Sequence, residues 1–210
     1  MIIARVLSGI IGYLFGCFLT ADLVAKKIAG TNASDIGGSG NPGMANVMAR
    51  LGFLPGLVTL AGDLLKCILA ALVSYALFKS TGHIVVFYAG VGCTIGHIFP
   101  FWRRFHGGKG VATTCIAVGL YAFWPGLAAN IIGMLVVFAT KYLCIGGPAI
   151  PLSFTLFMFA RGDLEGGILA AVLTLIAFYA HGKDIRGISR GTSKKTDVLG
   201  AITRKIKGEK

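Results

Sequence analysis

Charged residues are scarce in this sequence, and acidic residues are the scarcest of them. Asp, Glu, Lys and Arg together make up 13% of the 210 residues, and Asp and Glu account for only eight of these. Because a soluble domain typically carries about 25% charged residues, this chain has too little charge to cover a surface that faces mainly water. A soluble globular protein is therefore excluded.

Cysteine motifs that pair or bind metal are also missing. The five cysteines are odd in number, lie scattered in or beside apolar segments, and include no C-x-x-C pair. This pattern indicates neither a disulfide framework nor a zinc site. We expect the thiols to be small core residues, and we expect the protein to use no metal and no cofactor.

Long apolar runs take the place of the missing charge. The chain is 55% hydrophobic with a mean hydropathy of +0.79, and about 20 apolar residues suffice to cross a bilayer as a helix. The sequence therefore predicts an all-α integral membrane protein with seven transmembrane helices. The expected spans are Ile2–Ala25, Phe53–Phe78, Ile84–Phe101, Val111–Phe123, Leu127–Thr140, Ile145–Ala160 and Leu164–His181. A re-entrant segment between 110 and 161 is the alternative to three short spans in that region.

Cations are distributed unevenly between the two sides that these spans define. One side holds Lys26, Lys27, Arg50, Arg103, Arg104, Lys109, Lys141 and the basic C-terminal segment, and the other holds only Arg5, Lys79 and Arg161. Because Lys and Arg are enriched in cytoplasmic loops, we expect the N-terminus outside and the C-terminus in the cytoplasm. The expected organisation is a single transmembrane helical domain over 1–182 and a basic cytoplasmic tail over 183–210.

The net charge of +12 follows largely from this asymmetry. Cations at a membrane surface also attract anionic lipid by about 1 kcal/mol each, so membrane lipid is an expected partner. Nucleic-acid binding would require a soluble basic module, which the sequence does not contain, so no nucleic acid is expected. The oligomeric state is left open.

One stretch on the cation-rich side has the sequence pattern of a dinucleotide-binding motif. Residues 38–43, GSGNPG, satisfy G-x-G-x-x-G, and Asp63 follows at about the distance of the ribose-binding acid. That motif needs a preceding β-strand within a soluble βαβ unit, whereas a transmembrane helix and a polar loop precede it here. A dinucleotide site is therefore excluded by context.

Two glycine-rich segments, 37–43 and 106–113, fall on this same side. Their glycines permit positive φ angles and let backbone N–H groups point into a shared concavity. Lys109 adds a positive charge just before an expected helix start, where an anion is favoured. The pair of segments predicts a site for phosphate or a phosphate ester at the membrane surface. The alternative is that the glycines only form turns and the cations only set the topology.

Several ionisable residues lie within or at the ends of the expected spans. Asp63 and Lys66 share one helical face at i,i+3, which indicates a structural ion pair, with a catalytic pair as the alternative. Asp22 and Lys26, at i,i+4, indicate a pair at a helix end.

Two histidines, His97 and His181, end the third and seventh expected spans. Each is a candidate for proton transfer or for donating a hydrogen bond to phosphate. The alternative is an ordinary residue at the membrane interface.

The glycine-rich segments and the spacing of Asp63 and Lys66 match the motifs of one known family. Residues 38–46 stand where that family has G-S-G-N-x-G-A-T-N, and residues 96–100 and 107–113 match G-H-x-x-P and G-G-K-G-V-A-T. Over nearly its whole length the chain resembles the bacterial acyl-phosphate:glycerol-3-phosphate acyltransferase family (PlsY). The resemblance implies seven transmembrane helices with an external N-terminus, in the bacterial cytoplasmic (plasma) membrane, and an active site on the cytoplasmic face.

The resemblance also implies a reaction and roles for particular residues. A fatty acyl group would pass from acyl phosphate to the 1-hydroxyl of glycerol 3-phosphate, giving lysophosphatidate for phospholipid synthesis. Ser39, Lys109 and His181 would be active-site residues, and His97 or the substrate's own phosphate would take the proton. The residues expected to bind substrate are Gly38, Gly40, Asn41, Gly43, Asn46, Arg50, Gly107, Gly108 and Gly110.

The sequence departs from the family pattern in three places near the site. Met44 and Ala45 replace Ala-Thr, Arg50 follows Asn46 by four residues instead of three, and Asp184 replaces an Asn. These changes bear on the contacts to glycerol 3-phosphate. A divergent paralogue with another phosphorylated acceptor is the alternative that they leave open.

A function from another class is a small transporter or channel for an anionic phosphorylated solute. Transporters of this kind show internal repeats with interrupted helices and a binding site near the midplane. The sequence has no convincing repeat, and its glycine-rich motifs fall at the surface. A purely structural membrane subunit would leave the two glycine-rich segments unexplained.

Overall fold

The computed structural model describes residues 1–193 and 195, and these residues form nine α-helices and two short 3-10 helices without a strand. The predicted all-α class is confirmed. The predicted basic tail, 183–210, is described only as far as residue 193 and at residue 195. Its cations at position 194 and from 204 onward lie outside the described residues.

Two compact units divide the chain, Met1–Phe123 and Trp124–Lys210, which we call the N-terminal unit and the C-terminal unit. The N-terminal unit contains α1 (Ile2–Gly16), α2 (Thr20–Ala29), α3 (Met44–Leu51), α4 (Phe53–Phe78), η1 (Lys79–Thr81), α5 (Ile84–Ile98), η2 (Phe101–Arg103) and α6 (Val111–Tyr121). The C-terminal unit contains nearly all of α7 (Phe123–Thr140), then α8 (Leu143–Ala160) and α9 (Leu164–Ser189). A single domain over 1–182 stays a prediction.

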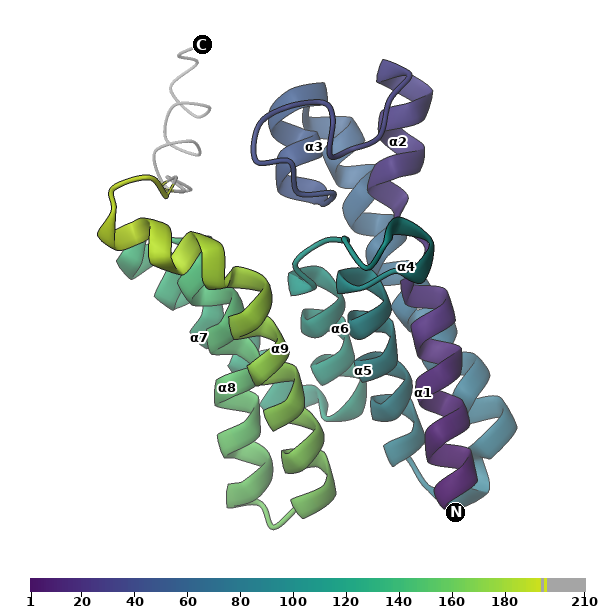
Figure 1. Ribbon diagram of the computed structural model, residues 1–210. Helices are drawn as coiled ribbons and strands as arrows, with labels where there is room; N and C mark the ends of the chain where they lie inside the picture. The colour runs from purple at the N-terminus through teal and green to yellow at the C-terminus, as the bar shows by residue number, and fades with distance from the viewer. Residues whose placement is uncertain (194, 196–210) are drawn as a thin grey trace. The chain divides into compact units, whose positions relative to one another are not determined.

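In the N-terminal unit, α1, α4, α5 and α6 pack against one another, and α2 and α3 extend beyond one end of them (Figure 1). Glycine residues allow the backbones of α1 and α5 to approach each other closely. A β carbon at Gly12 or Gly16 of α1, or at Gly92 or Gly96 of α5, would overlap a backbone carbonyl oxygen of the other helix. Small residues bring helices together in this way in lipid, where burial of apolar side chains gives no advantage over contact with the lipid tails.

The first expected span, Ile2–Ala25, is wrong in one respect. The helix ends at Gly16, and α2 begins only at Thr20. The ammonium group of Lys66 donates hydrogen bonds to the carbonyl oxygens of Gly16, at 3.2 Å, and Phe18, at 2.8 Å. The chain leaves the helical path here because a side chain from α4 takes up carbonyls at the helix end, which the apolar periodicity of the sequence does not reveal.

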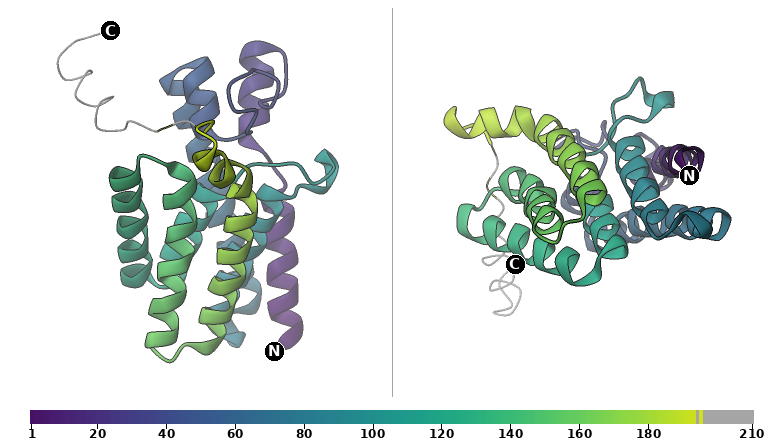
Figure 2. Two further views of the ribbon diagram at one scale, coloured as in Figure 1. Left: turned by 60° about the vertical axis from the view of Figure 1, so that its left-hand side comes forward. Right: turned by 90° about the horizontal axis from the view of Figure 1, so that it is seen from below.

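In the C-terminal unit, α7, α8 and α9 lie side by side (Figure 2). The gap expected between the spans Leu127–Thr140 and Ile145–Ala160 is confirmed, because Lys141 has a φ of 61° and lies between α7 and α8. The hydroxyls of Thr155 on α8 and Thr174 on α9 are 3.2 Å apart. The carboxylate of Asp163 caps α9 by accepting a hydrogen bond from the Gly166 amide at 2.9 Å.

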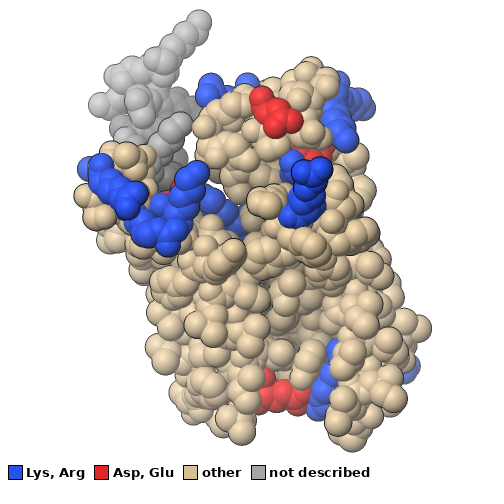
Figure 3. Space-filling model, viewed as in Figure 1, with Lys and Arg blue, Asp and Glu red and all other residues tan. Residues whose placement is uncertain are grey.

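Six segments of the described residues are long and apolar enough to cross a membrane. They are Ile2–Ala29, Phe53–Thr81, Ile84–Arg103, Phe123–Thr140, Leu143–Ala160 and Leu164–Ser189. The fourth expected span, Val111–Phe123, is the 11-residue helix α6, which rises about 16 Å against a hydrocarbon core of about 30 Å. Seven transmembrane helices therefore stay a prediction. Figure 3 shows a broad band without charged side chains on the N-terminal unit, with the visible Lys and Arg side chains beyond it at either end.

Candidate active site

The first glycine-rich segment, residues 37–43, forms a loop that is exposed at residues 37–40 and leads into α3. We call it the first loop. Gly37, Gly38 and Gly40 have φ angles of 86°, 74° and 65°, in the left-handed region that glycine adopts without strain. Gly43 is the N-cap of α3. The loop therefore ends at a helix N-terminus, whose unpaired N–H groups favour anions.

Two side chains of α3 hold the first loop. Asn46 is buried. Its side-chain oxygen, Oδ1, accepts a hydrogen bond from the Ser39 backbone amide at 3.0 Å, and its side-chain nitrogen, Nδ2, donates to Ala33 O at 3.2 Å. The guanidinium of Arg50 lies against Gly38, because a β carbon there would come within 3.0 Å of Arg50 Nε. The side chains expected to bind substrate thus support the loop, while Ser39 itself is exposed.

The first five residues of the second glycine-rich segment, 106–110, lie against the end of α5 and lead into α6. We call these residues the second loop. The amides of Gly107 and Gly108 donate hydrogen bonds, each 2.9 Å long, to the carbonyl oxygens of Ile98 and His97. Lys109 is half-buried. Gly110, with a φ of 75°, is the N-cap of α6.

Glycine is required at 107 and 108 by close contact. A β carbon at Gly107 would overlap His97 O, and one at Gly108 would overlap Nε2 of the His97 ring. The loop is thus pressed against α5, which fixes the backbone that carries Lys109.

A buried cluster of charged and polar groups lies beneath the second loop. Lys66 Nζ is 2.9 Å from Asp63 Oδ1 and 2.8 Å from His97 Nδ1, and all three residues are at most 4% exposed. The His97 nitrogen is also 3.6 Å from Asp63 Oδ1. The Lys66 ammonium therefore contacts Asp63, His97 and the backbone carbonyls at the end of α1. The buried charge is stabilised because opposite charge and hydrogen-bond acceptors surround it.

His181, the third expected active-site residue, lies in α9 of the C-terminal unit. It is 1% exposed, and Asp184 follows it in the same helix. Ser39 and Lys109 both belong to the N-terminal unit. That His181 joins them in one site stays a prediction.

The sequence reasoning missed the role of Arg103, which it used only to assign topology. Arg103 Nη1 is 3.2 Å from Asp22 Oδ2, and Arg103 Nη2 donates to Ser34 Oγ at 2.9 Å. The expected pair of Asp22 with Lys26 is wrong, because Asp22 pairs instead with this arginine from the segment before the second loop. A signal was present: Asp22 is an acid in an apolar stretch, and such acids need a buried partner.

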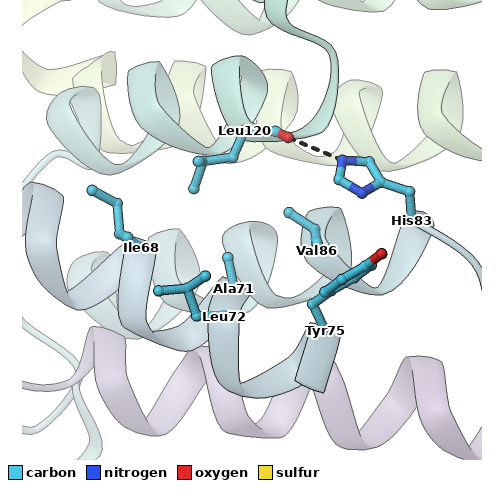
Figure 4. A pocket seen from close by; sticks show the side chains of 7 residues that line it. All are labelled: Ile68, Ala71, Leu72, Tyr75, His83, Val86 and Leu120. Atoms are coloured by element: carbon cyan, nitrogen blue, oxygen red, sulfur yellow. Dashed lines mark hydrogen bonds between the residues drawn. The ribbon is translucent and has the colours of Figure 1, made fainter. Parts of the chain in front are cut away.

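A pocket of about 350 Å³ lies elsewhere in the N-terminal unit, among α4, the start of α5 and the end of α6 (Figure 4). Its lining is apolar apart from Tyr75 and His83, and His83 Nε2 is 3.1 Å from the Leu120 carbonyl oxygen. No residue of either glycine loop lines it. Its apolar surface does not suit a phosphate.

Comparison with known sequences places the chain in one family. A family model described as glycerol-3-phosphate acyltransferase matches residues 6–191. Glycerol-3-phosphate acyltransferase 1 of Lactobacillus acidophilus is 38% identical over 203 residues, covering 97% of both chains. The glycerol-3-phosphate acyltransferase of a Bradyrhizobium species is 37% identical over 190 residues, covering 89% of this chain and 92% of the relative.

Solved structures agree with this placement. One is the crystal structure of PlsY (YgiH), an integral membrane glycerol 3-phosphate acyltransferase, in its glycerol 3-phosphate form. It matches with a TM-score of 0.81 and 25% identity, covering 94% of this chain and 98% of that one. The lysophosphatidic acid form of PlsY matches with a TM-score of 0.77 and 26% identity, covering 91% and 94%. The chain is thus an integral membrane protein, and it belongs to the glycerol-3-phosphate acyltransferase family.

Proposed function

We propose that this protein transfers a fatty acyl group from acyl phosphate to the 1-hydroxyl of glycerol 3-phosphate, giving lysophosphatidate. The observation that carries the proposal is the pair of glycine loops at the same end of the N-terminal unit (Figure 1). Each loop leads directly into the N-terminus of a helix, α3 or α6. Both substrates carry phosphate, and two such loops match that need.

The electrostatics of the loops favour anions. Lys109 places a positive charge next to the start of α6, where the helix dipole adds to it. The hydroxyl of Ser39 and the exposed glycine amides of the first loop supply neutral donors. Lys109 and Ser39 are the residues that we assign to direct contact with the substrates.

The chemistry requires positioning and charge stabilisation more than a covalent intermediate. The glycerol 3-phosphate oxygen attacks the acyl carbonyl carbon, the bond from that carbon to the phosphate oxygen breaks, and phosphate leaves. Donors such as Lys109 and Ser39 stabilise the developing oxyanion and the leaving phosphate.

The proton of the attacking hydroxyl goes to the phosphate of the substrate. His97 is unsuited to this step because it is 4% exposed, its Nδ1 is 2.8 Å from the Lys66 ammonium, and its Nε2 faces Gly108. We assign to His97 the support of the second loop.

The membrane placement of the site is part of the proposal. Seven transmembrane helices with the N-terminus outside put both loops on the cytoplasmic side of the bacterial plasma membrane, which the Lys and Arg distribution supports. A single transmembrane domain over residues 1–182 and a catalytic role for His181 are also part of the proposal. Membrane lipid surrounds the protein and receives the product.

The proposal is tested with purified protein in detergent or liposomes. Palmitoyl phosphate and labelled glycerol 3-phosphate should yield labelled lysophosphatidate, and other phosphorylated alcohols offered in parallel should react more slowly. No product from glycerol 3-phosphate under conditions in which the Lactobacillus acidophilus relative is active would contradict the proposal. Uptake of the labelled ester into liposomes without acyl transfer would favour the transporter.

A further inference from the structure

We propose that Arg103 is a positioning residue that sets the first loop relative to the second through a relay made of one ion pair and three hydrogen bonds. The relay runs from Arg103 through Asp22, Ala33 and Asn46 to the backbone of Ser39. Its residues belong to the N-terminal unit. The role in catalysis rests on the proposed function, whereas the relay itself does not.

The residue next to Arg103 in the relay is Asp22, whose carboxylate is buried, with the residue 2% exposed. Oδ2 is 3.2 Å from Arg103 Nη1, and Oδ1 accepts a hydrogen bond from the Ala33 amide at 2.9 Å. One carboxylate thus binds the arginine with one oxygen and the chain leading to the first loop with the other.

The relay continues through the backbone of Ala33 and the side chain of Asn46. Ala33 O accepts from Asn46 Nδ2 at 3.2 Å, and Asn46 Oδ1 accepts from the Ser39 amide at 3.0 Å. Ala33 is fully buried and Asn46 is 5% exposed. The two hydrogen bonds of Ala33, with Asp22 and with Asn46, are therefore buried, and a hydrogen bond is stronger in the protein interior than in water.

The other end of the relay is fixed to the second loop. Arg103 lies in the segment between α5 and Lys109, and neighbours anchor that segment. Trp102 Nε1 donates to Cys17 O at 2.7 Å, and the Tyr13 hydroxyl donates to Phe99 O at 2.9 Å. A shift of the first loop is thus resisted by groups held on α1 and α5.

The arginine fork suits this task in a way that lysine does not. Nη1 faces Asp22 while Nη2 donates to Ser34 Oγ at 2.9 Å, so one planar group holds two points of the segment before the first loop. A lysine keeps the charge, and hence the topology signal, but presents a single nitrogen. Arg103→Lys therefore removes the fork and little else.

The experiment compares Arg103→Lys with Arg104→Lys, a matched change at the next residue, which is exposed. The first measurement is amide hydrogen exchange of the purified full chain over residues 32–43. The second is the steady-state kinetics of labelled acyl transfer. Arg103→Lys should speed exchange in 32–43 several-fold and raise the KM for glycerol 3-phosphate about tenfold, the effect of losing one hydrogen bond to a charged group. Arg104→Lys should change neither.

The outcomes separate the two claims. Unchanged exchange in Arg103→Lys overturns the relay, whatever the activity. Faster exchange with an unchanged KM, or a fall in kcat alone, means that Arg103 only stabilises the fold and overturns the positioning role. If the wild-type protein transfers no acyl group, the proposed function fails, while the exchange data still decide the relay.

A further variant links the ends of the relay. Asp22→Asn should raise the same KM, and the double variant with Arg103→Lys should be no worse than the more affected single variant. Effects that simply add would show that the two residues act independently, which contradicts the relay.

Discussion

The two glycine loops of the N-terminal unit use glycine for different physical reasons. In the first loop, Gly37, Gly38 and Gly40 take positive φ angles and are exposed. In the second, Gly110 also has a positive φ, but Gly107 and Gly108 are needed because the end of α5 leaves no room for a side chain. The first loop is therefore shaped by its own backbone and held by side chains of α3, and the second is held by contact with a neighbouring helix.

Because of this difference, we expect the two loops to contribute to the site in different ways. The second loop lies on a buried ion pair and carries Lys109, so it suits a fixed charge. The first loop presents Ser39 at the surface and depends on Asn46 and Arg50 for its shape. Substitutions should therefore affect the two loops in different ways.

Removing the charge beneath the second loop should give the largest effect. Lys66→Ala leaves Asp63 buried without its cation and should lower the free energy of unfolding by about 3–5 kcal/mol. Thermal unfolding in detergent micelles measures this. The control is Lys79→Ala, at an exposed residue of η1 directly after α4, which should change stability little. Equal stability of both variants and the wild type would show that the cluster does not support the loop.

Removing the charge on the second loop should affect turnover rather than folding. Lys109→Ala should lower kcat by about 100- to 1,000-fold, the usual result of deleting one donor that stabilises a developing oxyanion, and Ser39→Ala should lower it by about 100-fold. Steady-state assays at saturating substrates measure both. Lys27→Ala, an exposed cation of α2, should keep normal turnover. Activity that survives in both variants would remove these residues from the site.

Adding one methyl group should distinguish the loops by sterics. Gly108→Ala places a β carbon against the His97 ring and should cost about 1–3 kcal/mol by overpacking, with reduced acyl transfer. Gly119→Ala in α6 meets nothing within 4 Å and should stabilise its helix by about 1 kcal/mol. Thermal unfolding of the pair is the measurement. A Gly108→Ala protein as stable and active as the wild type would contradict the close contact.

The smallest effect should come from the first loop. Gly40 has a φ of 65°. A β carbon added there would lie 3.6 Å from Ser34 O, which is an ordinary van der Waals contact. Asn tolerates this conformation, whereas Val does not, so Gly40→Asn should keep near-normal stability and Gly40→Val should lose about 1–2 kcal/mol. The ratio of kcat to KM should follow the same order. Equal losses for Asn and Val would mean that space, not φ, limits this position.

The sequence predicts most of what depends on neighbours along the chain. The apolar runs locate the long helices, the three-residue spacing of Asp63 and Lys66 puts them on one helical face, and the glycine-rich segments 37–43 and 106–113 mark the loops. These features are local, so periodicity and turn chemistry suffice.

The sequence does not reveal which distant segments contact one another. The break after Gly16 depends on Lys66, and the partner of Asp22 is Arg103 and not the nearby Lys26. Both are decided by how α1, α4 and the segment after α5 meet. Periodicity carries no information on which of many cations will reach a given buried acid.

The most direct test of the account asks whether phosphate ligands bind at the two loops. Hydrogen exchange of the purified protein is measured with and without glycerol 3-phosphate and inorganic phosphate at saturating concentrations. The account predicts slower exchange in residues 37–43 and 106–110, with both effects weakened in Lys109→Ala. Ligand binding that leaves the exchange of both segments unchanged would contradict it.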